Sequence, residues 1–459
     1  MDKIKVLLTP ELKNNKIESA AIKIVLVEPN LQQGSRIFQF HKDTVGVPFL
    51  SVSQRVQLLD EASLLEYTVV EKEIPKLKLE DYILNRSTLG DVQINYKVEL
   101  KPVGKNPAFD LGYEDGGMNG SGMSFLPVFE DTEYEFSLDW DLTKLPEGSR
   151  GIWSFGEGSV HTVQSGRVLA ESFYYAGNIK GVTRRNIGFY WFENSDLPGE
   201  EVGSFVITLF EKMAEFFEDS REPYQVFSRK VPEVLTGRNK IGGLALTRSF
   251  LYLYPEENPP KEETLKFLFP HEMVHNWLKL EDEPFGTCTW YVEGTAEYYS
   301  MVLPDRFGML KQDELVKQLN KRARDYYENP RLQVTNRYAG EHLFIDKEAT
   351  LIPYGRGFFY LLHMDECIRT KTDGKKSLDD VVLAIHSRVR AKEECGNEVW
   401  LEEVKKVAGL DASQEFEEMQ KGKVFLPKVT SFTTPIRVLE CKGIQRETGK
   451  ECVLYQFEG

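Results

Sequence analysis

The chain has 459 residues, of which 41% are hydrophobic and 28% charged, and its 57 basic and 72 acidic residues give a net charge of −15. This length is too great for one compact core and predicts two to four domains. The ordinary composition excludes a disordered, collagen-like or coiled-coil protein. An acidic surface repels phosphate backbones and anionic lipids, so we expect neither nucleic acid nor a membrane as a partner.

Several features of the sequence are typical of an intracellular protein. No apolar run reaches the about 18–20 residues of a membrane-spanning helix. The N-terminal residues MDKIKVLLTPELKNNK lack the basic start, apolar stretch and cleavage site of a signal peptide. The cysteines are odd in number and include no CxxC pair: Cys288, Cys367, Cys395, Cys441 and Cys452. Such usage indicates reduced thiols, so we expect a cytoplasmic protein. The oligomeric state leaves no readable pattern.

The first 185 residues are predicted to be mainly β-strands. Segments rich in β-branched and aromatic residues are bounded by Gly, Pro, Asn and Asp, which favours strands at 17–29, 89–100, 134–140 and 151–158. The Gly-rich segment GYEDGGMNGSG, at 112–122, lacks the Gly-Lys-Ser/Thr ending of a phosphate loop. It is predicted to be a surface loop.

The pattern becomes helical from about residue 200. Apolar residues three and four apart predict an amphipathic helix over 201–219. A strand-like block follows at 241–255, then helices around 262–280 and 291–303, a mainly helical stretch over 311–425, and an extended tail over 428–459. The fold class expected is therefore α+β and multidomain: an N-terminal β-rich domain (1–185), an α/β domain (186–310) and a C-terminal mainly helical domain (311–459).

The segment PHEMVHNWLKL, beginning at residue 270, carries the first chemical signal. His271 and His275 are four residues apart, so on a helix they lie about 40° apart on one face and can bind one divalent metal ion. Glu272 lies about 100° around the helix from His271. There it can accept a proton from a metal-bound water, whose pKa zinc lowers to about 7.

A catalytic zinc site needs a third protein ligand and an open fourth position. Glu293, in the helical-looking VEGTAEYYS, is the preferred candidate, and Glu281 and Glu283 in the preceding loop compete with it. Glu297 follows Glu293 by one turn on the same face. Its carboxylate can accept the outer N–H of a zinc-bound histidine and orient the ring.

The combination of HExxH with a WxxEGxxEYY block resembles the gluzincin metallopeptidases of the aminopeptidase N clan, and most of all the glycyl aminopeptidase family. Further similar stretches are FEDSREPYQVF at 217–227, IGGLALTRS at 241–249, the IPYGRGFFYLLHMDECIRTKTDGKKSLDDVV run at 352–382, and KGKVFLPKV near 421. The resemblance covers roughly 200–430. It implies a thermolysin-like α/β catalytic domain between the β domain and the helical domain, with one Zn²⁺ per chain and a peptide substrate.

The resemblance also implies roles for individual residues. His271, His275 and Glu293 would bind zinc, and Glu272 would be the general base. Tyr354, in the matching Tyr-x-x-Gly position, would donate its hydroxyl to the oxyanion of the tetrahedral intermediate.

The matching Gly-rich strand would contact the substrate. Its residues Gly242, Gly243, Leu244 and Ala245 would present a sheet edge to an extended peptide; a simple turn is the alternative.

The chain departs from the family pattern in three places. Ala245 stands where aminopeptidases of this clan have a Glu that holds the free amine of the substrate, so the anchor for an N-terminus is missing at this position. About 30 residues follow LPKV, too few for the PDZ domain of many bacterial members, and we expect none here. Pro270 precedes the first histidine, so the zinc helix either begins near it or bends there.

The leading hypothesis is a zinc-dependent peptidase, first of all an aminopeptidase acting on small N-terminal residues. An endopeptidase or oligopeptidase with the same mechanism is the alternative because of Ala245. A catalytically silent zinc protein that binds peptides is a rival of another class. Hydrolysis of an epoxide is a third possibility, which no residue favours.

Overall fold

The structure of the chain is a computed structural model that describes residues 1–44, 47–49, 56–74, 77–102, 106–193, 197–219, 223–231, 242–255, 262–281, 286–343 and 345–459. The chain forms two compact units. The first comprises Met1–Thr208 and Ser220–Pro260, and the second comprises Leu209–Asp219 and Lys261–Gly459. Within the described ranges, no helix has both the length and the apolar character needed to cross a bilayer.

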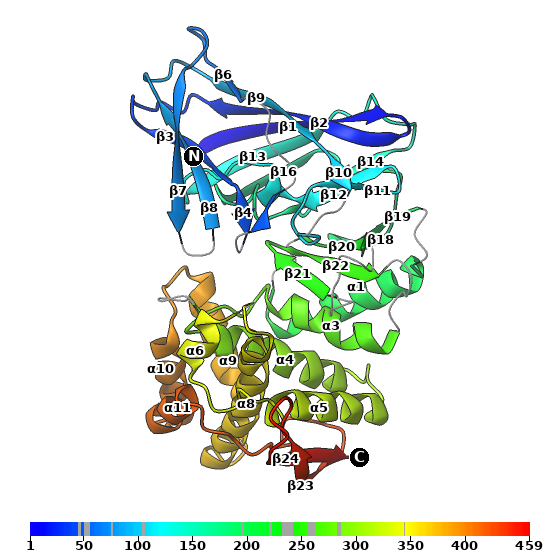
Figure 1. Cartoon of the computed structure of the whole chain (residues 1–459), viewed down its shortest axis with the longest axis vertical. Coiled ribbons are helices and arrows are strands. Elements are labelled where there is room, and N and C mark those ends of the chain that lie inside the picture. The colour runs from blue at the N-terminus through cyan, green and yellow to red at the C-terminus, as the bar shows by residue number, and fades with distance from the viewer. Residues whose placement is uncertain are drawn as a thin grey trace. The chain divides into compact units, whose positions relative to one another are not determined.

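The first unit consists mainly of β-sheets (Figure 1). Its elements are β1 (Asp2–Lys13), β2 (Lys16–Val27), β3 (Arg36–His41), β4 (Asp43–Thr44), β5 (Val47–Pro48), β6 (Gln57–Leu59), β7 (Tyr67–Ile74), β8 (Leu77–Leu84), β9 (Val92–Glu99), β10 (Lys101–Pro102), β11 (Gly112–Glu114), β12 (Gly117–Ser121), the short 3₁₀ helix η1 (Gly122–Ser124), β13 (Glu133–Trp140), β14 (Arg150–Trp153), β15 (Gly156–Glu157), β16 (Val160–Ser165), β17 (Phe173–Gly177), β18 (Ile179–Arg184), β19 (Ile187–Phe192), β20 (Tyr224–Val231), β21 (Gly242–Leu246) and β22 (Ser249–Pro255).

These strands form three large sheets and two small ones. Two six-stranded sheets have the orders β16-β13-β1-β2-β9-β6 and β10-β11-β12-β17-β14-β15. A five-stranded sheet has the order β18-β19-β20-β22-β21, so β21 lies at an edge and pairs only with β22 among the strands described. The small sheets are β3-β8-β7 and β4-β5.

Alternation of apolar and polar residues explains the strands of the first sheet. In β2, every second side chain from Ile22 to Leu26 is buried, as in a sheet with one face against the core. Val6 of β1 pairs with Ile24 of β2 on one side and with Leu138 of β13 on the other, and all three are buried in the same core cluster. The strands predicted from β-branched and aromatic residues at 17–29, 89–100 and 134–140 are confirmed, whereas 151–158 forms the hairpin of β14 and β15.

The prediction of a surface loop at 112–122 is wrong. The segment forms the hairpin β11–β12, and every residue of β12 is buried because it pairs with β17 on its other side. The turn residues Asp115 and Gly116 both have positive φ, 48° and 83°, which is the geometry of a type I′ turn and the reason an Asp-Gly pair stands there.

The second unit consists mainly of helices (Figure 1). Helix α1 (Gly199–Phe216) begins in the first unit and ends in the second. The remaining elements are α3 (Glu262–Val274), α4 (Thr289–Arg306), α5 (Gln312–Tyr327), α6 (Asn336–Glu341), α7 (Lys347–Thr350), α8 (Ile352–Lys371), α9 (Leu378–Arg390), α10 (Asn397–Ala408), α11 (Ser413–Gln420), and the hairpin strands β23 (Arg437–Ile444) and β24 (Glu451–Glu458).

Helices α4 and α8 form the centre of this unit, and most of their side chains are buried on all sides. They approach closely at two glycines. A Cβ on Gly294 of α4 would lie 2.5 Å from Gly357 Cα of α8, and a Cβ on Gly357 would lie 2.0 Å from the Trp290 carbonyl oxygen. Any larger residue at either position would force the helices apart.

The two units give a coarser description than the predicted three domains. The chain has a large β-rich N-terminal part and a helical C-terminal part, as expected. The boundaries between the units lie at 208–209, 219–220 and 260–261, inside the range predicted for the catalytic domain, and the division at 185 and 310 stays a prediction. The helix expected around 262–280 is shorter and ends at Val274.

Candidate metal centre

The two histidines of the HExxH motif lie at the C-terminal end of α3. The helix begins at Glu262 and continues through Pro270 to Val274, so it does not begin at the proline. His271 is in the last turn, and His275 is the first residue after the helix. Their ring centroids are 5.0 Å apart with an interplanar angle of 86°. The spacing of four residues therefore brings both rings to one place, as predicted.

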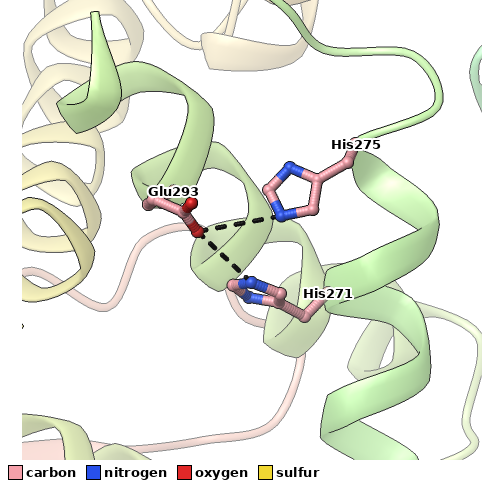
Figure 2. A group of neighbouring side chains, drawn as sticks. All are labelled: His271, His275 and Glu293. Atoms are coloured by element: carbon pink, nitrogen blue, oxygen red, sulfur yellow. Dashed lines mark ion pairs between the residues drawn. The ribbon is translucent and has the colours of Figure 1, made fainter. Parts of the chain in front are cut away.

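Helix α4 brings the glutamates to the same place. Glu293 Oε2 lies 3.4 Å from His271 Nε2 and 3.7 Å from His275 Nε2, as Figure 2 shows. Glu297, one turn further along α4, lies 3.3 Å from the other nitrogen of His271, Nδ1. Glu293 and Glu297 thus lie beside the two different ring nitrogens of His271, and their roles as third ligand and as outer partner stay a prediction.

The cluster has the geometry and chemistry of a tetrahedral metal site. Nitrogen and oxygen ligands about 2.0–2.1 Å from a tetrahedral zinc lie about 3.3–3.4 Å from each other, close to the separations found here. His271, His275 and Glu293 each offer one ligand atom within 4.8 Å of the others. Glu293 Oε2 is buried and accepts no hydrogen bond from the described residues. A cation between these three atoms would give it a partner, so the residues present fit zinc.

The electrostatics of the cluster also favour a positive charge. Burial opposes the charged form of His271, but contacts with Glu293 and Glu297 outweigh it and raise the pKa of His271 to about 10. Burial lowers the pKa of His275 to about 4, so this ring is neutral at neutral pH and has a lone pair to offer. Burial raises the pKa of Glu272 to about 7, against the effect of His271.

Arg322 of α5 completes the surroundings and was not predicted from the sequence. Its Nη2 lies 2.5 Å from Glu297 Oε1. Although burial opposes the charged carboxylate, Arg322 holds the pKa of Glu297 at about 2. The sequence does hold a signal for Arg322: it follows Leu315 and Leu319 at helical spacing and so lies on the buried face of α5. A charged residue at such a position needs a buried partner.

Tyr354 lies in the first turn of α8, next to the histidines. Its ring is parallel to that of His271, with centroids 5.9 Å apart and an interplanar angle of 6°. The Arg322 guanidinium lies 5.9 Å from the centre of the Tyr354 ring. Burial and the neighbouring carboxylates, first among them Glu293, raise the pKa of Tyr354 well above its usual value. The phenol therefore keeps its proton and can act as a hydrogen-bond donor.

The other residues predicted for the site belong to other elements. Gly242, Gly243, Leu244 and Ala245 are half-buried in the edge strand β21 of the first unit and do not form a turn. Glu281 is exposed and is not in the cluster of ligand atoms. Glu283 lies outside the described residues.

Residues 264–338 match the family model described as M61 glycyl aminopeptidase. This match confirms the resemblance predicted from the sequence. The matched segment contains both histidines, Glu293, Glu297 and Arg322, but ends before Tyr354. No curated protein matches the sequence.

Solved structures with a similar fold include several zinc metallopeptidases. An aminopeptidase N family protein from Idiomarina loihiensis has a TM-score of 0.70 at 14% identity, covering 95% of this chain and 79% of its own. An M1 zinc metallopeptidase from Deinococcus radiodurans, solved with a Tyr-Ser-Ala substrate, has a TM-score of 0.56 at 14% identity, with 93% and 94% covered. Leukotriene A4 hydrolase from Saccharomyces cerevisiae has a TM-score of 0.57 at 13% identity, with 94% and 69% covered.

At these identities the likeness is one of fold. Together with the family match, it supports a peptide-bond hydrolase of the metallopeptidase class.

Proposed function

We propose that this protein is a zinc-dependent aminopeptidase that removes small residues from the N-termini of peptides, with a thermolysin-like catalytic region over 186–310. The observation that carries the proposal is the convergence of His271, His275 and Glu293 on one point, with Tyr354 stacked beside His271. A purely structural zinc site is closed by a fourth protein ligand. Among the described residues this cluster offers three ligand atoms, which leaves a position for water and substrate, as catalysis requires.

Zinc held by these residues would polarise the scissile carbonyl and lower the pKa of a bound water to about 7. The Glu272 carboxylate takes the proton of the attacking water and passes it to the nitrogen of the leaving amine. The Tyr354 hydroxyl donates a hydrogen bond to the carbonyl oxygen as negative charge develops there.

Glu297 and Arg322 orient the His271 ring so that its zinc-binding nitrogen faces the site. Glu297 accepts the Nδ1–H of His271, which leaves Nε2 free to bind zinc, and Arg322 keeps Glu297 ionised. This arrangement supports a single tautomer of His271 in the loaded enzyme.

The edge strand β21 is the proposed contact for the substrate backbone. Gly242, Gly243, Leu244 and Ala245 offer main-chain groups that can pair with an extended peptide, and the edge position of β21 supports this role. Ala245 carries no charge to hold the amine of an N-terminal residue. An aminopeptidase must therefore supply an acidic group from another position.

Ala245 favours an endopeptidase of the same mechanism as the second candidate function. The two functions differ in whether the substrate amine is bound by a carboxylate, because an internal peptide bond has no free amine to anchor.

A mass-spectrometric cleavage profile of a mixed peptide library tests the proposal. We expect zinc-loaded protein to release single small N-terminal residues, and Glu272→Gln to lose this activity while still binding zinc. Glu281→Gln is the matched control, because Glu281 is exposed and close in sequence. Internal cuts that depend on Glu272 would replace the aminopeptidase by the endopeptidase. No cleavage by zinc-loaded protein would refute both and favour a silent peptide-binding protein.

A further inference from the structure

A second group of metal-ligating side chains lies on α8 and α11, outside the candidate metal centre. His363 and Cys367 are four residues apart on α8, and Glu415 is on α11. One ligand atom from each lies within 4.8 Å of the others. The His363 Nε2 atom lies 3.5 Å from Cys367 Sγ and 3.9 Å from Glu415 Oε1. All three side chains are half-buried, so an ion can reach them from solvent.

We propose that His363, Cys367 and Glu415 form a second metal site, which binds Zn²⁺ through one nitrogen, one sulfur and one oxygen ligand. The site does not depend on the proposed peptidase function.

The separations fit a tetrahedral ion. With Zn–S of about 2.3 Å and Zn–N of about 2.0–2.1 Å, the nitrogen and sulfur ligands lie about 3.6 Å apart, against 3.5 Å between His363 and Cys367. The His363–Glu415 separation of 3.9 Å is about half an ångström longer than the about 3.4 Å expected of a nitrogen–oxygen pair. A small rotation of the Glu415 side chain would close this difference.

The ligand chemistry selects the class of ion. A thiolate with an imidazole suits Zn²⁺, Co²⁺ or Cd²⁺, whereas Mg²⁺ and Ca²⁺ prefer oxygen ligands alone. Three protein ligands leave the fourth position to water. The site would therefore take up a thiophilic divalent ion and exclude the abundant hard cations.

The surroundings keep His363 ready to bind. Its ring packs on Phe425, with centroids 5.0 Å apart. With the ordinary pKa of about 6.5, a histidine ring is mostly neutral at neutral pH, and its nitrogen can bind a metal ion. Lys428 pairs with Glu366 at 2.9 Å, and this ion pair does not involve Glu415.

A cysteine thiol is mostly protonated at neutral pH and binds a metal ion as the thiolate. The thiol then keeps its proton until a metal ion displaces it, so binding releases a proton. The contact between Cys367 Sγ and His363 Nε2 is a thiol–imidazole hydrogen bond without the metal.

The second site is separate from the first in position and in chemistry. His363 follows Tyr354 by nine residues on α8, which is about 14 Å along a helix axis. The first cluster, His271, His275 and Glu293, contains no sulfur. Charge transfer from a thiolate to bound Co²⁺ therefore reports only on a site that includes a cysteine.

The test is a Co²⁺ titration of full-length protein that already carries one equivalent of Zn²⁺. We expect a thiolate-to-Co²⁺ absorption band in the near ultraviolet, release of protons, and protection of Cys367 from alkylation. The band should disappear when excess Zn²⁺ displaces the cobalt. Protein dialysed against Zn²⁺ should contain two zinc ions per chain, and Cys367→Ser should contain one and show no band. Glu415→Gln and His363→Gln should weaken Co²⁺ binding by more than the about 10–100-fold typical of a lost outer partner.

The matched controls are Cys441→Ser, which removes a half-buried thiol outside the cluster, and Glu417→Gln, which changes another acid of α11. Both should bind Co²⁺ as the unchanged protein does. The proposal is wrong if reduced protein gives no band, if the band survives Cys367→Ser, or if Glu415→Gln and His363→Gln bind with unchanged affinity. If Cys367→Ser does not fold, two measurements test the site instead: the Co²⁺ affinity of Glu415→Gln, and the protection of Cys367 from alkylation by Co²⁺ in the unchanged protein.

Discussion

Replacing Gly357 with alanine tests whether the close contact of α4 and α8 positions Glu293 and Tyr354, the proposed zinc ligand and the proposed oxyanion donor. The new Cβ would lie 2.0 Å from the Trp290 carbonyl oxygen, whereas real Cβ atoms essentially never come within 3.0 Å of another heavy atom. The difference of 3.0 − 2.0 Å means that the helices must separate by about 1 Å. Because Glu293 is on α4 and Tyr354 is on α8, this separation would move the two side chains apart.

The expected effect falls mainly on catalysis. A displacement of about 1 Å in an active site costs on the order of 10²-fold in rate. Overpacking costs about 1–3 kcal/mol of stability, and the higher helix propensity of alanine offsets about 1 kcal/mol of it. We therefore expect Gly357→Ala to fold and to bind zinc as the unchanged protein does, because all three proposed ligands lie on α3, α4 or the turn after α3.

The assay combines steady-state peptidase kinetics, zinc content and urea unfolding of the same preparations. Thr370→Ala is the matched control, since it places an alanine on an exposed position of the same helix. Folded, zinc-containing Gly357→Ala with kcat within about twofold of the control would refute the argument that helix spacing positions Tyr354.

Three further predictions concern the charged and polar groups. Glu297→Gln should weaken zinc binding by about 10–100-fold, because the side chain beside His271 Nδ1 loses its negative charge. Competition with a chelator measures the zinc affinity, and an unchanged affinity would contradict the role of Glu297. Arg229→Met should destabilise the first unit by about 1–3 kcal/mol, because the buried guanidinium donates hydrogen bonds to Asn119 and to the Pro107 carbonyl, and these oxygens would lose that donor. Lys23→Met, at an exposed position, is the control in urea unfolding. Burial lowers the pKa of His41 from 6.5 to about 4, so the unfolded chain binds a proton that the folded chain does not bind between these pH values. The free energy of unfolding should therefore fall by up to about 3 kcal/mol from about pH 6.5 to 4, and an equal fall in His41→Gln would contradict this.

Local patterns predicted the elements and the motif of the candidate centre. Richness in β-branched and aromatic residues between turn residues identified β2 and β9, and apolar spacing identified α1, because both signals depend on residues close together in the chain. The spacing of His271 and His275 predicted that their rings meet, since four residues make about one helical turn. The Asp115-Gly116 turn was also a local signal, but the glycines around it favoured a loop in the prediction.

Contacts between distant segments could not be predicted in the same way. Arg322 lies 25 residues after Glu297 along the chain (322 − 297 = 25) and meets it only because α5 packs beside α4. Glu415 meets His363 only because α11, which follows α9 and α10 in the chain, lies beside α8 in the fold.

The amino-acid sequence by itself therefore determined which residues could bind a metal, because ligand chemistry and helical spacing are local properties. Tertiary structure decided which of these residues meet and at what distance. The glycines at 294 and 357 illustrate the reason: their role appears only when two buried helices pack, since the space denied to a Cβ is set by the other helix.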